Sequence, residues 1–394
     1  MTHRLTVRRA TDADVEPILD LLTHYDLPRS HFEPLYYEDP SYRPEQSLVA
    51  EADGALVAHL RLFPRELRLG GAARPLPVLG VGNVVTAREW RERGHLRSFL
   101  GRVLGAAERR PYAFAILWTY VPQVYARQGF ETLTVPVTTA VVPPGYTPGA
   151  PVSATVFRTE ELPEVEEFAA RYAAGLSGTT VRSHDYWTGQ LRWLAEDPLG
   201  FLVARDDAGR LTGYVRSRHT DGETEILELA VLAGDRDTAR ALLAAVSRRT
   251  GGTLRGFLPA SQRELLGRPL HSEVAEAPGP MLRVLNSGAL TDALSGLLPQ
   301  RLSAQGLSAL DLSVESLPHP GASARSAPGM RPLALRAEPS GVRVLDGRPV
   351  DEALHCTPAS LARLMLGGAP PGAPGWLSEL LPARDWVLWD ADRV

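Results

Sequence analysis

The stretch VVTAREWRERGHLRSF, residues 84–99, constrains this chain strongly because its character changes halfway along. It begins as a β-branched run, passes through arginines grouped around one glycine, and continues with apolar residues at helical spacing. The apolar stripe of this helix consists of Leu96, Phe99, Leu100, Val103, Leu104 and Ala107. The pattern predicts a strand that leads through a short, positively charged loop directly into a helix.

Such a loop has the properties of an anion site. The first four N–H groups of an α-helix lack intrahelical partners, and the helix dipole makes that end partly positive. A glycine lets the backbone approach a diphosphate closely, and arginines add bidentate donors. Arg91 and Gly94 occupy the required places between strand and helix. Because R-x-x-G is a weak motif, a solvated, arginine-rich helix start is the alternative on these residues alone.

The elements around this stretch alternate between strands and helices. Asp53-Gly54 is a dipeptide that suits a tight turn between two strands. Gly129 is expected to follow the last helix of this segment as its C′ residue. In chain order, a strand, a helix, a hairpin, a strand, a helix, a strand and a helix are expected at 5–10, 15–22, 47–63, 75–86, 96–107, 112–119 and 121–130.

The order of elements then repeats after a Pro/Gly-rich stretch at 141–152, which marks a domain boundary. The repeated helix, hairpin, strand and helix are expected at 159–175, 201–218, 226–232 and 237–249. The second copy lacks the arginine–glycine pattern before its last helix. An internal duplication in which one copy has lost its loop accounts for this difference.

A third region begins near 281–290 and includes an amphipathic helix at 357–368 that Thr357 can cap. Its loop at 319–330 is too rich in Pro, Gly and Ser to pack. The run DWVLW at 385–389 is too apolar for a loose tail and is expected to dock.

Composition narrows the class of protein. The 394 residues predict two or three domains, and no apolar run approaches the roughly 20 residues of a membrane span. A net charge of -4 gives no electrostatic reason to expect nucleic acid. The single Cys356 leaves no disulfide or cysteine cluster for a metal, and no metal is expected. With a charged start that lacks a signal-peptide pattern, these features favour a soluble, cytoplasmic protein. Without lysine, no Lys nucleophile is available.

The order of elements around the opening stretch resembles the GNAT superfamily of acetyl-CoA dependent N-acetyltransferases. Its pyrophosphate loop reads Q/R-x-x-G-x-G/A, which Arg91 and Gly94 match, while Leu96 replaces the final small residue. Leu at this place, the three-part organisation and the VYARQGFE segment resemble the enhanced-intracellular-survival (Eis) acetyltransferases. The resemblance implies an α+β fold of two tandem GNAT-like mixed α/β domains, the second degenerate, followed by a sterol-carrier-protein-like α/β domain. The expected boundaries are 1–145, 146–284 and 285–394.

The resemblance also implies how acetyl-CoA, the co-substrate, binds. Its pantetheine arm would pair with the edge of a strand that is splayed open, as an added peptide strand does. Gly80 and Gly82 are compatible with such an opening. Tyr120 and Val121 would lie beside the thioester. The remaining donor-binding residues are Val84, Val85 and Thr86 for pantetheine, and Arg91, Glu92, Arg93, Gly94, His95, Leu96 and Arg97 for the diphosphate.

For the chemistry, the resemblance makes Tyr125 the general acid, since a phenol can protonate a thiolate without being ionised at neutral pH. A backbone N–H near Val84 would stabilise the oxyanion. The terminal carboxylate of Val394 would help to deprotonate the amine. Burial or a water relay would have to make that carboxylate basic enough, and the neighbouring Arg393 opposes this. From the residues alone, a Tyr125 that only packs on the sheet and a terminus that only fills a groove stay open as alternatives.

The implied acceptor is a small-molecule primary amine. Asp26 and Tyr36 align with positions that family members use for polyamine-like substrates, including aminoglycosides. Arg393, by contrast, would repel a polycation. Relatives form homo-oligomers, commonly hexamers, and neither nucleic acid nor membrane is an expected partner. Two other readings remain: transfer to protein or peptide N-termini, and a non-enzymatic protein whose C-terminal domain carries an apolar ligand.

Overall fold

The computed structural model describes residues 5–25, 27–70, 72, 74–143, 146, 152–191, 200–232, 234–251, 253–267, 270–314, 333–345, 353–369 and 372–388. By its internal contacts the chain divides into two compact units. Unit 1 takes the described residues within 1–133 and 279–383, and unit 2 takes those within 134–278 and 384–393. Two long strands, β6 (Glu131–Val141) and β12 (His271–Val284), each contribute residues to both units. The division into three domains stays a prediction.

Unit 1 contains a mixed sheet with the strand order β1-β2-β3-β4-β5-β12. The pairs β1–β2, β2–β3 and β3–β4 are antiparallel, β4 and β5 are parallel, and β12 is antiparallel to β5. Asp53 and Gly54 join β2 to β3 with φ of 52° and 81°, which confirms the predicted tight turn. The first five strands are β1 (Thr6–Arg9), β2 (Ser47–Ala52), β3 (Ala55–Leu67), β4 (Leu76–Thr86) and β5 (Phe114–Leu117).

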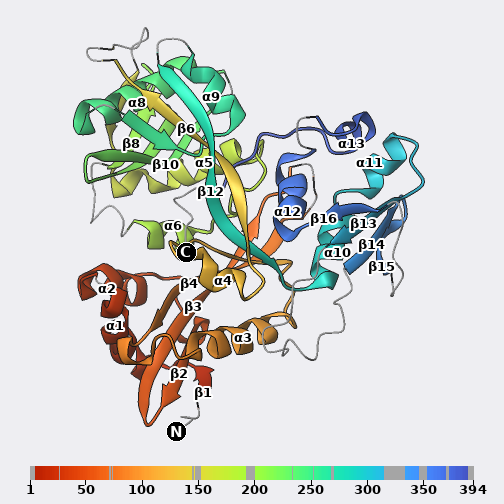
Figure 1. Cartoon of the computed structure of the whole chain (residues 1–394). Helices are drawn as coiled ribbons and strands as arrows, with labels where there is room; N and C mark the ends of the chain where they lie inside the picture. Colours follow the sequence, from red (N-terminus) through yellow and green to blue (C-terminus); the bar gives the residue numbers. More distant parts are fainter. Residues whose placement is uncertain are drawn as a thin grey trace. The chain divides into compact units, whose positions relative to one another are not determined.

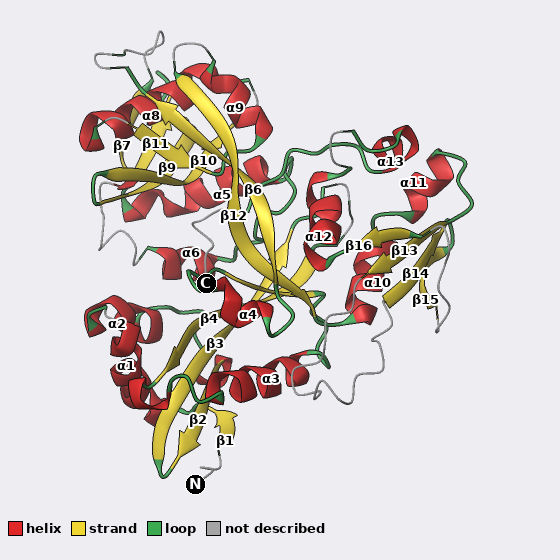
Figure 2. Ribbon diagram, in the orientation of Figure 1, coloured by secondary structure: helices red, strands yellow, loops and turns green. Residues whose placement is uncertain are grey.

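Helices cover both faces of these strands, with α1 and α2 on one side and α3 on the other (Figure 2). One core packs α1 (Val15–Leu22) and α2 (Arg29–Tyr37) onto the sheet around Ile18, Leu22 and Phe32. The other packs α3 (His95–Ala107) through the predicted stripe, of which Leu96 is only partly buried. The short helix α4 is Pro122–Ala126, and Gly129 follows it with φ of 85°, as expected for a C′ residue.

The rest of unit 1 forms a second, smaller sheet with helices (Figure 1). Its strand order is β15-β14-β13-β16. Thr357 caps α12 by accepting a hydrogen bond from the N–H of Ser360 at 3.2 Å, which confirms the predicted cap. The elements are α10 (Ser287–Ser295), α11 (Pro299–Ala304), β13 (Leu310–Val314), β14 (Leu333–Glu338), β15 (Gly341–Leu345), β16 (Leu354–Cys356), α12 (Pro358–Gly367) and α13 (Gly375–Leu380).

Unit 2 repeats the strand directions of unit 1. Its order is β6-β11-β10-β9-β8-β7, in which β7, β8, β9 and β10 pair antiparallel and β10 pairs parallel with β11. The strands are β7 (Ser153–Val156), β8 (Phe201–Arg205), β9 (Leu211–Thr220), β10 (Glu223–Val231) and β11 (Thr253–Gly256). The helices are α5 (Leu162–Ala173), α6 (His184–Gln190), α8 (Arg236–Thr250) and α9 (Ala260–Leu266).

The apolar run near the end of the sequence docks within unit 2. The N–H of Ser177 donates to the carbonyl oxygen of Asp385, and the N–H of Val387 donates to that of Ser177, both at 3.0 Å. Trp386 packs edge-on against Phe257 at 4.9 Å between ring centroids. Residues 385–388 are therefore tied to the unit 2 core, as the sequence predicts for this run.

Candidate functional site

Strand β4 pairs with β5 only near the start of β4, and the rest of β4 extends beyond this pairing. The parallel ladder joins Val78, Leu79 and Gly80 to Phe114, Ala115 and Ile116. On its other side β4 stays paired with β3 as far as Thr86. In the described part of the chain, β4 therefore continues past Gly80 with its β5 side open, as the splayed strand implied by the family resemblance requires.

The β3–β4 ladder sets which backbone groups face this opening. The N–H of Ala87 donates to the carbonyl oxygen of Val57 at 2.9 Å, so Ala87 and, two residues earlier, Val85 turn their polar groups toward β3. Because neighbouring residues of a strand alternate, Val84 and Thr86 turn their N–H and C=O groups the other way. The open side of β4 thus presents backbone donors and acceptors to anything that enters the gap.

A bulge interrupts β4 at this point. The register shifts between His59 and Arg61, so that Asn83 and Val84 together face the single Leu60. Asn83 has φ of 51°, a left-handed conformation that is uncommon for a residue other than glycine. The bulge bends the strand where the ladder with β5 has ended, and it changes the direction of the Asn83 carbonyl.

Two side chains bind carbonyl oxygens along the open edge. The hydroxyl of Tyr25, at the end of the 3-10 turn Thr23–Tyr25, donates to the carbonyl oxygen of Val84 at 2.6 Å. The guanidinium of Arg91 donates to the carbonyl oxygens of Thr86 at 3.1 Å and His24 at 2.7 Å. Arg91 therefore braces its loop against the strand and the turn, a role that the sequence did not indicate.

The loop before α3 ends in a left-handed backbone. Gly94 has φ of 78° and ends the loop in the left-handed region, and Glu92 is also left-handed with φ of 62°. The first helical hydrogen bond runs from the N–H of Ser98 to the carbonyl oxygen of Gly94 at 3.1 Å. The three N–H groups before Ser98, those of His95, Leu96 and Arg97, therefore have no acceptor within the helix.

Positive charge surrounds this helix start. Arg93, Gly94 and Arg97 are exposed. Within the described ranges, no ion pair or side-chain hydrogen bond engages the guanidinium groups of Arg93 and Arg97. His95 packs its ring against Trp90 at 5.0 Å between centroids. The loop combines N–H donors with two exposed arginines, a combination suited to a diphosphate.

Tyr125 lies in α4 with only 7% of its surface exposed. Its ring packs edge-on against Phe130 at 6.1 Å between centroids. Burial raises the pKa of its phenol to about 12, so the hydroxyl is protonated at neutral pH. Burial also raises the pKa of Tyr25, and the nearby phenol of Tyr125 adds to that increase. The phenol of Tyr25 is the group that binds the Val84 carbonyl oxygen.

Tyr120 and Val121 lie just before α4 and are both exposed, Tyr120 by 93%. The N–H of Val121 donates to the Thr119 hydroxyl at 3.0 Å. Among the described residues nothing covers the Tyr120 ring. The position of Tyr120 and Val121 beside the thioester of acetyl-CoA stays a prediction.

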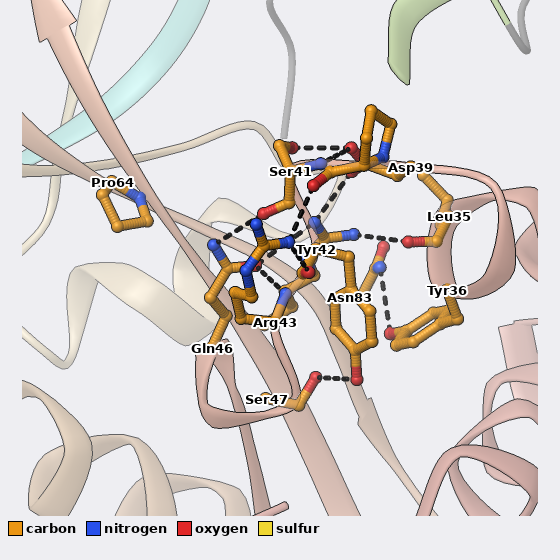
Figure 3. Close-up of polar contacts among 12 residues, drawn as sticks. Leu35, Tyr36, Asp39, Ser41, Tyr42, Arg43, Gln46, Ser47, Pro64 and Asn83 are labelled. Atoms are coloured by element: carbon orange, nitrogen blue, oxygen red, sulfur yellow. Dashed lines mark hydrogen bonds and ion pairs between the residues drawn. The ribbon is translucent and has the colours of Figure 1, made fainter. Parts of the chain in front are cut away.

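Tyr36 is buried in α2, with 5% of its surface exposed. Its hydroxyl accepts a hydrogen bond from the side-chain amide of Asn83 at 3.3 Å, as Figure 3 shows. Its ring packs against those of Tyr42 and His59 at 5.0 and 6.1 Å. Tyr36 therefore supports the β4 bulge, a role distinct from the substrate contact expected of it. Of the other predicted site residues, Asp26 and Val394 lie outside the described residues.

A buried arginine holds this part of α2 in place. Arg61 on β3 donates to the carbonyl oxygen of Leu35 at 2.8 Å and to the Asp39 carboxylate at 2.9 Å. Its guanidinium lies 4.7 Å from the ring centroid of Tyr42. Taking the arginine and carboxylate out of water is costly, and the paired hydrogen bonds offset that cost. Arg61 thus fixes the end of α2, and with it the position of Tyr36.

Residues 6–133 match a family model described as an acetyltransferase (GNAT) domain. This segment is a GNAT domain. It contains the open β4 edge, the α3 loop and Tyr125. No curated protein sequence matches the chain.

Solved structures resemble the chain over nearly its whole length. A probable N-acyltransferase from Enterococcus faecalis V583 has a TM-score of 0.68 at 17% identity, covering 93% of this chain and 90% of its own. Eis1 from Mycobacterium abscessus has a TM-score of 0.67 at 16% identity, covering 99% and 100%. A GCN5-related N-acetyltransferase from Kribbella flavida has a TM-score of 0.65 at 18% identity, covering 98% of each chain. These similarities show a shared mixed α/β fold.

Within the described residues, no three His, Cys, Asp or Glu side chains are grouped as a metal ion would require. No described helix combines the length and the apolar character needed to span a bilayer.

Sequence reasoning missed four residues around the bulge of β4: the buried His59 and Arg61, the half-buried Asn83 and the more exposed Tyr25. A signal was present in AHLRLF, residues 58–63, where His59 and Arg61 alternate with apolar residues. Alternation of this kind is also typical of a strand with one solvated face. Only the structure shows that α2 covers that face and buries both side chains.

Proposed function

We propose that the GNAT domain transfers an acetyl group from acetyl-CoA to a primary amine. The observation that carries the proposal is the open edge of β4, where Val84 turns its N–H and C=O groups into the gap. Tyr125 is a buried, protonated phenol of the same domain, and its electrostatic interaction adds to the effect of burial in raising the pKa of Tyr25, which binds that edge. Backbone groups that bind a thioester arm and a buried acid that protonates a thiolate are both required for this reaction.

The pantetheine arm of acetyl-CoA would extend along Val84, Val85 and Thr86. Its amides would pair with the open edge as a short added strand. Tyr25 already donates to the Val84 carbonyl oxygen, but a carbonyl oxygen has two lone pairs and can accept a second hydrogen bond. Tyr120 and Val121 would border the thioester end.

The diphosphate would bind where α3 begins. Gly94 brings the backbone close, the N–H groups of His95, Leu96 and Arg97 would donate to it, and Arg93 would add charge. Glu92 forms the left-handed turn before Gly94. Arg91 belongs to this loop and would act mainly by bracing it, since its bonds go to Thr86 and His24.

The reaction needs three functions. The amine nitrogen would attack the acetyl carbon, and the N–H of Val84 would stabilise the resulting oxyanion. The C–S bond would then break, and Tyr125 would give its proton to the departing thiolate. A base must remove a proton from the amine, and the Val394 carboxylate is our candidate by family resemblance.

The acceptor is proposed to be a small-molecule amine that approaches from the side of α1 and α2. Asp26 and Tyr36 are the candidate contacts. Burial limits Tyr36 to contact through its hydroxyl, which already accepts a bond from Asn83. An amine at the N-terminus of a protein or peptide would use the same chemistry.

Unit 2 is proposed to be a degenerate copy of the GNAT fold. Its strand directions repeat those of β1 to β5, and β10 shifts register between Ile226 and Glu228 much as β4 does at its own bulge. Its helix start differs: Asp235 caps α8 by accepting from the N–H of Thr238 at 3.0 Å. A carboxylate at that place repels an anion, so unit 2 would not bind a second CoA.

The remaining expectations extend this proposal. Residues 285–394 would form a sterol-carrier-protein-like domain, in which β13 to β16 pair as a separate sheet. The domain boundaries near 145 and 284, the cytoplasmic location and a homo-oligomer, hexameric as in relatives, belong to the same proposal.

The test combines binding with turnover. Acetyl-CoA at 100 times its dissociation constant should stabilise the protein by about 2.7 kcal/mol in a thermal shift assay. A panel of primary amines, including polyamines, aminoglycosides and a peptide N-terminus, should release CoA thiol in the presence of acetyl-CoA. Absence of a shift at millimolar acetyl-CoA would contradict the donor site. Binding without thiol release from any amine would favour a non-enzymatic role.

A further inference from the structure

The left-handed Asn83 at the β4 bulge needs support from its surroundings. A residue other than glycine with φ near 50° is strained by about 1 kcal/mol or more, and such residues persist only where neighbouring groups hold them. Strained backbone of this kind occurs often at functional sites. The groups that hold Asn83 therefore point to what its conformation is for.

Three side chains from three elements hold the bulge. His59 on β3 bonds through its Nδ1 to the carbonyl oxygen of Asn83 at 3.0 Å. The hydroxyl of Tyr36 accepts from the Asn83 side-chain amide at 3.3 Å, and the hydroxyl of Tyr25 donates to the Val84 carbonyl oxygen at 2.6 Å. We name Tyr25, Tyr36 and His59 the bulge clamp.

The clamp sets the direction of one backbone donor. Since a trans peptide unit is planar, its C=O and N–H groups point in opposite directions. His59 holds the carbonyl of Asn83, so the N–H of Val84 must point away from His59. Tyr25 holds the next carbonyl, which limits rotation of the Val84 backbone on its other side. The alternation of the β3–β4 ladder independently turns this N–H toward the open edge.

Burying His59 costs more free energy than burying an apolar side chain would, so packing alone does not account for a histidine at this place. Its side chain is fully buried. A carbonyl oxygen can only accept, so Nδ1 carries the proton, and Nε2 is left as a buried lone pair without a partner among the described residues. An unsatisfied buried polar atom costs about 1–3 kcal/mol, whereas an apolar side chain would avoid that cost.

His59 also stays neutral. Burial lowers its pKa to about 3, so the ring carries no charge at physiological pH. Neither a charge nor a proton exchanged with solvent is then available from it. The remaining contribution of the ring is the fixed Nδ1–H donor on Asn83.

We propose that His59 is a positioning residue for acyl transfer: through Asn83 it aims the Val84 N–H at the site of the oxyanion, with Tyr25 and Tyr36 supporting the same bulge. This inference rests on the proposed function, because it specifies how the oxyanion donor is held. A donor fixed before the reaction begins needs no reorganisation as the charge develops.

The decisive comparison is between His59→Leu and His59→Asn. Leu fills much of the space but has no donor, while the Asn side-chain amide can place an N–H where Nδ1 lies. We expect His59→Leu to lower kcat about 10- to 100-fold, less than or equal to the loss caused by deleting an oxyanion donor outright. The Kd for CoA, measured calorimetrically, should stay within about twofold because CoA carries no oxyanion. His59→Asn should restore most of kcat.

Tyr25→Phe provides a second test on a partly exposed residue that is suited to substitution. It removes one hydroxyl and should lower kcat about 3- to 10-fold. Tyr37→Phe is the matched control, because the Tyr37 hydroxyl bonds to Glu16 on the surface of the same helix region. The pH profile of each variant should keep the wild-type midpoints, since His59 does not titrate in this range.

The outcomes separate the two proposals. Wild-type protein that binds no CoA and acetylates no amine overturns the proposed function. Active wild type with His59→Leu at wild-type kcat, or with His59→Leu and His59→Asn equally slow at unchanged thermal stability, overturns the positioning role alone. If His59→Leu does not fold, the Tyr25→Phe and His59→Asn rates decide.

Discussion

The guanidinium of Arg91 donates a 3.1 Å hydrogen bond to the carbonyl oxygen of Thr86, the last residue of β4. The same guanidinium reaches the carbonyl of His24, so it connects the α3 loop to both the strand and the turn after α1. The arginine of the R-x-x-G pattern is thus bound to backbone, while the exposed side chains of Arg93 and Arg97 remain available to a ligand. We therefore expect replacement of Arg93 and Arg97 to affect mainly the binding of acetyl-CoA, and replacement of Arg91 to affect the stability of the fold as well.

Replacing Arg93 and Arg97 together by Ala should raise the KM for acetyl-CoA about 5- to 20-fold and leave the melting temperature nearly unchanged. Each exposed arginine contributes roughly 0.5–1 kcal/mol to a phosphate contact. Steady-state kinetics at two salt concentrations would measure this, with a smaller variant effect at high salt. An increase confined to the amine KM would contradict the diphosphate assignment.

Arg91→Ala should act differently, because it removes two hydrogen bonds within the fold. We expect the free energy of unfolding to fall by about 1–2 kcal/mol, together with a moderate rise in the KM for acetyl-CoA. Chemical denaturation monitored by fluorescence gives the stability. A variant with normal stability but a strongly raised KM would mean that Arg91 contacts the donor directly.

Gly94→Ala should impair donor binding and cost stability through its backbone conformation. Gly94 has φ of 78°, and no atom lies within 4 Å of an added Cβ, so the cost is conformational, about 1 kcal/mol. Gly209→Ala is the matched control in unit 2, with the same φ and equally open surroundings. Both variants should lose similar stability in thermal melts. Equal KM values for acetyl-CoA in the two variants would argue against an anion site at Gly94.

Tyr125→Phe should lower kcat by about two orders of magnitude while the Kd for CoA stays within about twofold. The folded pKa of about 12 lies above the ordinary value of 10, so the protonated form is favoured by folding. The stability linked to this group is therefore complete below pH 10 and is lost as pH rises toward 12. The wild-type protein should lose more stability over that interval than Tyr125→Phe does. An unchanged kcat would remove Tyr125 from the mechanism.

Docking of residues 385–388 should depend on Gly178. A Cβ at Gly178 would lie 2.5 Å from the carbonyl oxygen of Val387, too close for any side chain. Gly178→Ala should therefore detach this segment and increase its cleavage in limited proteolysis. Gly222→Ala, with a similar positive φ of 82° but open surroundings, controls for backbone strain. If Gly178→Ala lowers kcat and Gly222→Ala does not, the segment after Asp385 contributes to catalysis, as the proposed role of Val394 requires.

The sequence alone predicted the elements that local rules control. Asp53-Gly54 forms its turn because both residues tolerate a left-handed backbone, and Gly94 starts α3 for the same reason. The apolar stripe of α3 became one core of unit 1 because spacing along a helix decides which side chains share a face. Local chemistry was also enough to find the cap at Thr357 and the docked run at 385–388, whereas the splayed strand was expected only from the family resemblance.

Tertiary structure decided everything that depends on distant residues. His59, Asn83 and Tyr25 lie far apart in the sequence, and no local pattern shows that their side chains meet at one bulge. Tyr36 is buried because Arg61, on another element, fixes the end of α2. A sequence pattern records the preferences of each segment, whereas the direction of one N–H group and the burial of one histidine are set by the neighbours that packing brings together.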